Sequence, residues 1–190
     1  MNMYKNLEIN FQEQYFDIEA PIIPGVSLGG IQQGMLVKGL EKMFRTDQYF
    51  ARDKKISLVT TPSLRYIEYW YMGGIIRLKV DIYDGRITNI IATKGYQGTV
   101  NGVLRVGMTV REVLQVDAGF TCYSPPGGLM SPNFLGICLY FTPNFDAETD
   151  SLSDYMDHKI LGIGLINEFN AEGDDVYVML YGLNHPRFNG

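Results

Sequence analysis

Carboxylates are the side chains of this sequence that could most readily take part in chemistry, and they are concentrated between residues 144 and 158. The segment contains Asp146, Glu148, Asp150, Asp154 and Asp157. Calcium prefers such closely spaced oxygen ligands, but the glycine that an EF-hand needs at the sixth loop position is missing. Three interpretations stay open: a solvated hairpin tip, a metal site, and a loop whose Asp146, Asp150 and Asp154 steer a basic partner. Because the spacing of these carboxylates does not match the EF-hand, we predict neither a bound metal ion nor a cofactor.

An aromatic run forms the second group of candidate functional residues. It spans residues 66–72 and reads YIEYWYM. Alternate side chains of a strand point to opposite faces, so residues 66, 68, 70 and 72 share one face and 67, 69 and 71 share the other. Tyr and Trp are enriched at binding hot spots, and we therefore predict that Tyr66, Tyr69, Trp70 and Tyr71 contact a partner. Two alternatives stay open: helices cover the run, or it is a platform on which carbohydrate stacks.

Two residue pairs could support catalysis, Cys122 with His158 and Glu68 with Asp81. A nucleophilic thiol needs a neighbouring base or a helix N-terminus, and the sequence around Cys122 offers neither. Glu68 and Asp81 fall on adjacent predicted strands, as a hydrolytic pair could, but polar strand faces commonly carry such residues. The sequence therefore predicts a protein that is not an enzyme. A carbohydrate-binding or hydrolytic function, using sheet carboxylates and aromatics, is the alternative.

Composition narrows the classes of function further. The chain has 190 residues, of which 46% are hydrophobic and 19% charged, so it can bury a core. Its formal net charge of -5 argues against nucleic acid as a partner, because a phosphate backbone attracts a basic surface. The 2 His and 2 Cys would all be used by a single Cys/His zinc site.

The sequence shows neither a secretory signal nor a long apolar span. We therefore expect no membrane partner and a cytoplasmic location, although a periplasmic chain whose signal has been removed would look the same. Cys122 and Cys138 both lie in apolar surroundings, which indicates buried free thiols. A disulfide between them stays open, since it depends on their separation in space.

The candidate functional residues belong to a sequence that contains an internal repeat. Residues 25–40 align with residues 98–113 without a gap, at an offset of 73 residues. Identical pairs are Gly25/Gly98, Gly29/Gly102, Gly34/Gly107, Met35/Met108 and Val37/Val110. The same offset matches residues 86–90 with 159–163 further along. The glycine-rich segment 29–34 lacks the Lys and Ser/Thr of a phosphate-binding loop, so its recurrence indicates turn geometry.

Each repeat predicts a short amphipathic helix followed by antiparallel strands. The second helix should be capped by Thr109 with Glu112 in a capping box. Gly73-Gly74 and Asp84-Gly85 are signals of tight hairpin turns. The helices are expected at Leu36–Phe44 and Thr109–Val116, and the strands at Ile56–Val59, Leu64–Met72, Ile75–Ile82, Ile87–Thr93, Phe120–Tyr123, Leu135–Phe141 and Ile160–Ile166.

The predicted fold class is therefore α+β, with antiparallel sheet or sheets and short helices. We expect one domain over residues 1–190. It would contain tandem repeats at about 22–95 and 96–168, forming one pseudo-symmetric body, and a terminal strand at about 176–181.

The repeated pattern G-x-x-(I/L)-x-x-G-M-x-V-x-x-(L/V), followed by a sheet, resembles a known unit. It is similar to the unit of the SmpA/OmlA outer-membrane lipoproteins and of the beta-lactamase inhibitor protein, which carries it in tandem. Lys94-Gly95-Tyr96-Gln97-Gly98, with the segment 104–113, also resembles uncharacterised bacterial immunity-like proteins. The chain differs from these relatives because it lacks the lipid-anchoring cysteine, and Asp117-Ala118-Gly119-Phe120-Thr121 replaces their acidic run.

The resemblance implies a protein that binds another protein, as an immunity protein or inhibitor occludes a toxin or an enzyme. Aromatic anchors and the acidic loop would supply its contacts. The third hypothesis is an oligomeric structural subunit, and we expect a monomer or a homodimer.

Overall fold

The computed structural model describes residues 16–36, 56–60, 65–123, 128–142 and 149–166. Three predictions lie outside these ranges: the helix Leu36–Phe44 beyond its first residue, the acidic residue Asp146, and the strand at 176–181.

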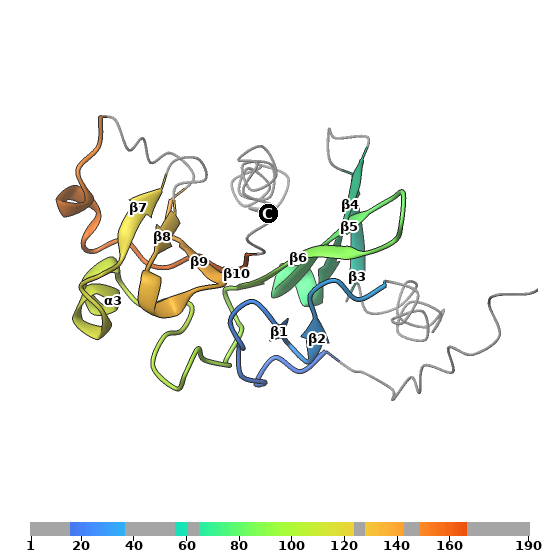
Figure 1. The fold of residues 1–190 in the computed structure, drawn as a ribbon, viewed down its shortest axis with the longest axis horizontal. Coiled ribbons are helices and arrows are strands. Elements are labelled where there is room, and N and C mark those ends of the chain that lie inside the picture. Colours follow the sequence, from blue (N-terminus) through green and yellow to red (C-terminus); the bar gives the residue numbers. More distant parts are fainter. Residues whose placement is uncertain (1–15, 37–55, 61–64, 124–127, 143–148, 167–190) are drawn as a thin grey trace, which may run out of the picture.

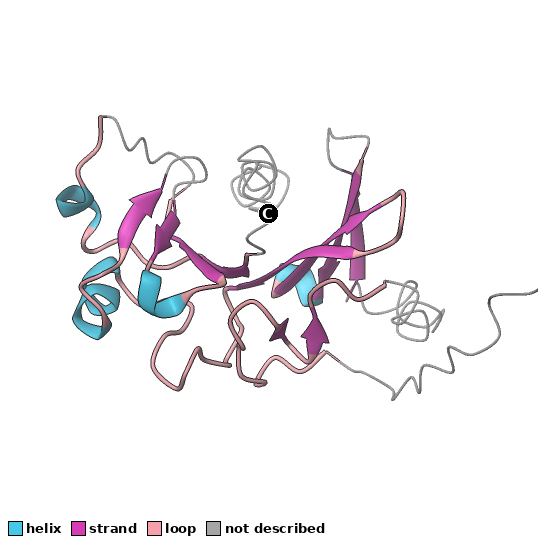
Figure 2. Cartoon of the chain, viewed as in Figure 1, coloured by secondary structure: helices cyan, strands magenta, loops and turns pink. Residues whose placement is uncertain are grey.

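A single antiparallel sheet dominates the described residues (Figures 1 and 2). It has eight strands in the order β3-β4-β5-β6-β10-β9-β8-β7. The chain builds one half from its outer edge inward, β3 to β6, and the other half from the opposite edge inward, β7 to β10. The strands are β3 (Ile56–Thr60), β4 (Tyr66–Tyr71), β5 (Ile76–Asp81), β6 (Ile87–Thr93), β7 (Thr121–Tyr123), β8 (Gly128–Met130), β9 (Ile137–Tyr140) and β10 (Gly162–Leu165).

The two halves join where β6 pairs with β10. In this antiparallel pair Thr93 lies opposite Gly162 and Ile91 lies opposite Gly164. The β1 (Ser27–Leu28) and β2 (Ile31–Gln32) ribbon and the helix α3 (Val110–Val116) lie on the same side of the curved sheet (Figure 2). Short 3-10 turns occupy Met72–Gly74 (η2), Pro132–Phe134 (η3) and Leu152–Tyr155 (η4).

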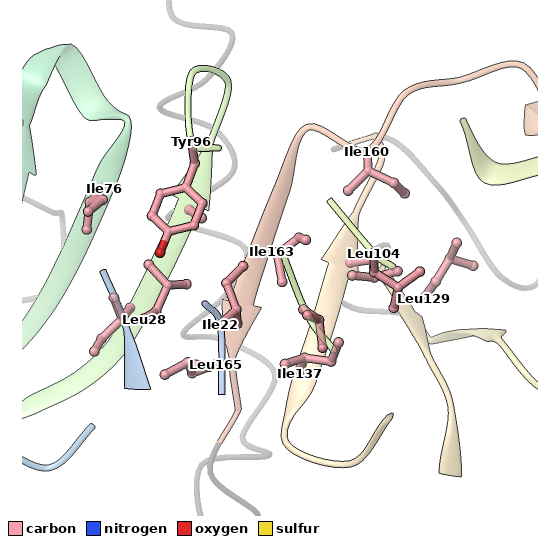
Figure 3. Packing of buried hydrophobic residues seen from close by; sticks show 14 of the residues in the cluster. Ile22, Leu28, Ile76, Tyr96, Leu104, Leu129, Ile137, Ile160, Ile163 and Leu165 are labelled. Carbon is pink, nitrogen blue, oxygen red and sulfur yellow. The ribbon is translucent and has the colours of Figure 1, made fainter. Parts of the chain in front are cut away.

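Alternating apolar residues give the sheet a core face. Burying such a side chain completely contributes about 1.5–3 kcal/mol, so this face anchors the layers above it. Ile22, Leu28 and Leu104 from the covering segments pack against β5, β9 and β10 (Figure 3). The buried residues of the core face include Ile76, Leu78, Val80, Ile90, Ala92, Leu129, Ile137, Leu139, Ile163 and Leu165.

Helix α3 begins where the sequence predicts. The backbone N–H of Glu112 donates to the Thr109 hydroxyl, and the backbone N–H of Thr109 donates to the Glu112 carboxylate at 2.7 Å. Val110 and Val113 are buried against the sheet. The capping box is therefore confirmed, and it fixes the end of the loop that leads into α3.

The α+β class and the antiparallel strands are confirmed, with two local corrections. The sequence pattern did not predict β8, a three-residue strand that pairs with both β7 and β9. The hairpin after β4 is longer than a two-residue turn, because Tyr71 pairs with Ile76 and leaves four residues between them. Positive φ values at Met72, Gly73 and Gly74 allow this wider turn.

Candidate binding surface

The predicted aromatic run is strand β4, and its side chains divide between the two faces of the sheet. Tyr69 and Tyr71 pack against the core, and Tyr71 stacks on Phe16 with ring centroids 4.3 Å apart. Trp70 faces the other way and is only 3% exposed, while Tyr66 on that same face is half-buried. The four aromatic residues therefore do not form one exposed patch.

The face opposite the core, which we call the far face, carries charged side chains in β4 and β5. Cross-strand pairing sets Glu68 opposite Lys79 and Trp70 opposite Arg77. The Trp70 indole Nε1 donates to Glu68 Oε2 at 2.9 Å. The Arg77 guanidinium lies 4.0 Å from the centre of the Trp70 ring, and Lys79 Nζ lies 4.1 Å from that of Tyr66. Cations thus stack on aromatic faces beside a carboxylate, an arrangement favoured in desolvated surroundings.

Burial dominates the electrostatics of this cluster. It raises the pKa of Glu68, and the hydrogen bond from Trp70 and the charges of Arg77 and Lys79 offset only part of that rise. Burial likewise lowers the pKa of Arg77 to about 10. The cluster is therefore a buried network whose members depend on one another, since removing Glu68 would leave the charges of Arg77 and Lys79 buried without its neighbouring carboxylate.

Asp81 lies on the same far face but behaves differently from Glu68. Burial raises its pKa, yet hydrogen bonds from the Tyr83 backbone and from Arg65, together with the Arg65 charge, bring the pKa below its ordinary value. Carboxyls whose pKa values move apart suit an acid and a base. However, Glu68 and Asp81 are both buried and both bonded within the chain.

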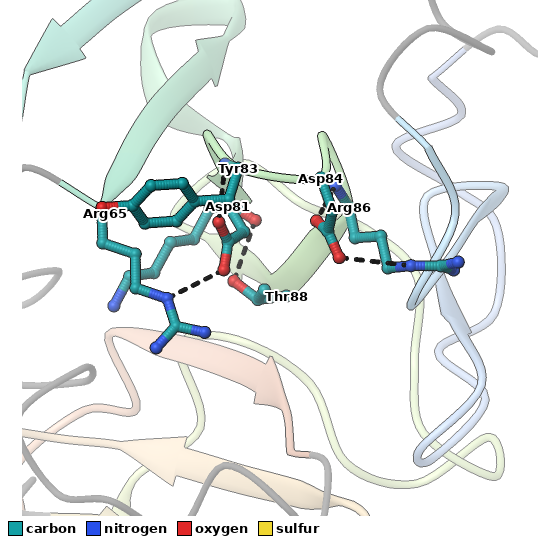
Figure 4. A network of polar contacts seen from close by, with 7 residues as sticks. Arg65, Asp81, Tyr83, Asp84, Arg86 and Thr88 are labelled. Atoms are coloured by element: carbon teal, nitrogen blue, oxygen red, sulfur yellow. Dashed lines mark hydrogen bonds and ion pairs between the residues drawn. The ribbon is translucent and has the colours of Figure 1, made fainter.

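The hairpin between β5 and β6, residues 82–86, presents the most exposed aromatic side chain among the described residues. Tyr83 is 80% exposed and its neighbour Ile82 is 47% exposed. Figure 4 shows the polar network below them, in which Asp81 accepts from Arg65 and from the Tyr83 backbone, both at 2.9 Å. Ile82 and Tyr83 were not among the residues predicted from the sequence. The available signal was the Asp84-Gly85 turn with two large apolar residues directly before it.

The described part of the acidic segment is partly neutralised within the chain. The Tyr155 hydroxyl donates to Asp150 Oδ2 at 2.8 Å, and Arg111 pairs with Asp157 at 3.1 Å. Asp154 is exposed in the first turn of η4, while Asp146 lies outside the described residues. Asp150 therefore lies just before this short 3-10 turn, and Asp154 lies within it.

The two cysteines are free and lie on opposite faces of the sheet. Cys122 packs against the core, whereas Cys138 belongs to a separate cluster on the far face with Ile91 and Tyr140. Burial raises the pKa of Cys122 to about 11 and that of Cys138 to about 12. Such thiols stay protonated at neutral pH, so Cys122 lacks the thiolate character of a nucleophile.

The described ranges contain neither a cluster of metal ligands nor a membrane-spanning helix. In those ranges no three His, Cys, Asp or Glu side chains come together as a metal site would require. The described helices are also all too short or too polar to cross a bilayer.

Comparison with known proteins identifies no relative of this chain. No family model, no curated protein and no solved structure matches the chain.

Proposed function

We propose that this chain is a protein-binding module that works by occlusion, as an immunity protein or an inhibitor does. The observation that carries the proposal is the placement of large apolar side chains on turns that the backbone holds in place. Tyr83 on the β5–β6 hairpin and Leu135 on the β8–β9 connection are 80% and 67% exposed. Tyr is among the residues enriched at the hot spots of protein interfaces, and a preorganised loop lowers the entropic cost of binding.

A second exposed group supports the same function. Gly25 N–H donates to the Gly136 carbonyl at 3.0 Å, so the loop that carries Val26 lies against the loop that carries Leu135. A Cβ at Gly136 would come within 2.5 Å of Gly25 N, which makes glycine necessary for this approach. Ile23, Val26 and Leu135 are all exposed beside it.

We further propose that the chain is built from two tandem units, at about 22–95 and 96–168. Equivalent backbone bonds support this. In the first unit Gly34 N donates to Ile87 O at 2.9 Å and Ile87 N donates to Met35 O at 2.8 Å. In the second unit Gly107 donates to Ile160 at 2.8 Å and Ile160 donates to Met108 at 2.7 Å, so every partner is displaced by the predicted 73 residues.

The binding mechanism separates anchoring from steering. The apolar residues on the turns bury area against the partner, while Asp150 and Asp154 add an acidic field in a chain of formal net charge -5. Electrostatic steering of this kind raises the association rate for a basic partner and weakens with added salt.

The test is co-expression of the chain with the products of the genes that flank it, followed by affinity capture and gel filtration. We expect a stoichiometric complex with one of them, and inhibition of that protein if it is a toxin or an enzyme. If every flanking product elutes separately from the chain, the proposal is wrong.

The hydrolytic or carbohydrate-binding alternative has one observation in its favour, the opposite pKa shifts of Glu68 and Asp81 on one sheet face. A glycan array and a hydrolysis screen with the wild type and Glu68→Gln would establish it if activity disappears in the variant. The structural-subunit alternative predicts instead a stable homo-oligomer in the same gel filtration.

A further inference from the structure

The far face of the sheet is buried, although no described segment lies over it. In the single chain, Ile91, Cys138 and Tyr140 on this face, which we call the far-face cluster, are 3%, 1% and 0% exposed. Within the described ranges, the apolar side chains that pack against the cluster are Met130 of β8 and Ile166, both continuous with the sheet itself. A sheet face becomes buried when a second layer packs on it. The layer that covers the far face therefore belongs to this chain and lies outside the described residues.

The described segments that pack on the sheet lie on its core face. The β1–β2 ribbon and α3 are on that side (Figure 2), and Leu28 and Leu104 belong to the core cluster. Phe16 belongs to the same cluster and stacks on Tyr71, so residues 1–15 join the described chain on the core side. Three further segments outside the described residues are too short to form a layer: residues 61–64, 124–127 and 143–148.

The position of Ile166 shows on which side the chain leaves β10. Ile166 is the last described residue, it packs against the far-face cluster, and its backbone N–H donates to the Gly136 carbonyl at 2.9 Å. Residues 167–190 therefore start on the far face. In the sheet order β10 lies three strands from β4. Neighbouring strands are about 4.8 Å apart and an extended residue spans about 3.3 Å, so about five residues would reach β4.

Charge distinguishes residues 167–190 from the other long segment that could reach this face. Beside Arg77 and Lys79 the far face carries one carboxylate, that of Glu68, so cations are in excess there. Residues 167–190 contain four carboxylates and one arginine. Residues 37–55 contain six basic and three acidic side chains, and the two buried cations would repel them. The charge of residues 167–190 thus complements the far face, and that of residues 37–55 does not.

We propose that residues 167–190 fold back over the sheet and form the layer that buries the far face. The apolar run at 176–181 would pack on the far-face cluster, and the carboxylates of the segment would face the two cations. The far face is then internal, so Tyr66 and Trp70 belong to the interior of the chain and not to a partner surface. This inference goes beyond the proposed protein-binding function and holds whether or not a partner is found.

The test cuts the segment from a chain that has already folded. A protease recognition sequence is inserted between Ile166 and residue 167, and gel filtration at low concentration then separates the body from the cut segment. The matched control carries the same sequence before Phe16, so that cutting removes residues 1–15. The probes are the two native thiols, since Cys138 lies on the far face and Cys122 on the core face.

The rates of reaction with a thiol reagent decide the outcome. Once the segment is removed, Cys138 should react at least about 10-fold faster, because contact with water reverses the burial that raises its pKa. Cys122, and both thiols of the control, should react as in the uncut chain. An unchanged rate for Cys138, in a body that has lost the segment and keeps its circular dichroism, would overturn the inference. A rate for Cys138 that rises when the uncut chain is diluted would overturn it in favour of a second copy of the chain.

A measurement on the uncut chain decides the case in which the body unfolds without the segment. Trp70 is the single tryptophan and lies on the far face. A dye on Asn184→Cys, attached while the native thiols are buried, accepts energy from Trp70 over a short distance only. We expect efficient transfer in the native chain and its loss in urea. Transfer as weak in the native chain as in urea would overturn the inference.

Discussion

The two halves of the sheet share the same antiparallel meander but fill their far faces in different ways. In β4 and β5 the far face carries Glu68, Trp70, Arg77 and Lys79, where the Trp70 indole donates to Glu68 and the Arg77 guanidinium stacks on the Trp70 ring. On the same face β9 carries Cys138 and Tyr140 and β10 carries Gly162 and Gly164, and the Tyr140 ring lies against Gly164. The first half of the sheet is thus stabilised by interactions between charged and aromatic side chains, and the second by close packing. Different substitutions should therefore destabilise each half.

The largest loss of stability is expected from a substitution in the charged half of the sheet, which comprises β3 to β6. Glu68→Ala removes the carboxylate that accepts the Trp70 N–H and faces two buried cations, so we expect a loss of about 3–5 kcal/mol in the free energy of unfolding. Urea denaturation measures it. Glu68→Gln keeps a hydrogen-bond acceptor and is the matched control, with a smaller loss. Equal stabilities of the wild type and Glu68→Ala would show that the cluster contributes nothing.

In the packed half of the sheet, which comprises β7 to β10, the corresponding substitution adds a methyl group instead of removing a side chain. A Cβ at Gly164 would lie 2.8 Å from Tyr140 Cε2, while Tyr140 itself is fully buried. Gly164→Ala should therefore cost about 1–3 kcal/mol of stability through overpacking. Combining it with Tyr140→Leu, which vacates the ring, should recover part of the loss in a double-mutant cycle. Strict additivity of the two changes would mean that the ring and the glycine are independent.

The pH dependence should separate two carboxyls within the charged half. Glu68 has a raised pKa in the folded chain, so its contribution is fully present below its unfolded value near 4.5 and is lost as pH rises through the folded pKa. Asp81 has a lowered pKa, so its contribution is present above 3.8 and is lost as pH falls through the folded pKa. The sign of the pH effect therefore differs between them.

Unfolding curves between pH 2 and 8 test this difference. The stability of the wild type relative to Glu68→Gln should decline with rising pH. Its stability relative to Asp81→Asn should decline toward acid. Parallel curves for all three proteins would contradict both assignments.

The smallest expected effect concerns the reactivity of the two thiols, which lie on opposite faces of the sheet. With its pKa near 11, Cys122 should be ionised in only about one molecule in a thousand at pH 8. We expect both cysteines to react slowly with a thiol reagent in the folded chain and rapidly in urea, with Cys138 slower than Cys122 because it is fully buried. Rapid reaction of Cys138 without denaturant would show that the far face opens around β9.

Sequence reasoning performed best in the charged half, for a physical reason. Strict alternation and the turn signals at Gly73-Gly74 and Asp84-Gly85 place β4, β5 and β6 within a residue or two of their observed bounds. Helix α3 was found from its capping box. In the packed half β8 escaped notice, because a Gly-Leu-Met strand that follows Pro and Gly residues looks like part of a loop.

The candidate site was harder to foresee than the fold. Alternation separates Trp70 from Tyr69 and Tyr71, but both faces of β4 are aromatic, so the pattern cannot say which one meets the core. Exposure of Tyr83 depends on what the rest of the chain leaves uncovered around a turn. The Asp84-Gly85 signal locates the turn, but the exposure of the side chains before it is a property of the tertiary structure.

Hydrogen exchange of the chain with and without its captured partner shows whether the β5–β6 hairpin contacts that partner. We expect amides of the hairpin 82–86 to exchange more slowly in the complex, while those of β7 (Thr121–Tyr123) are unchanged. Protection at β7 with an unaltered hairpin would contradict it.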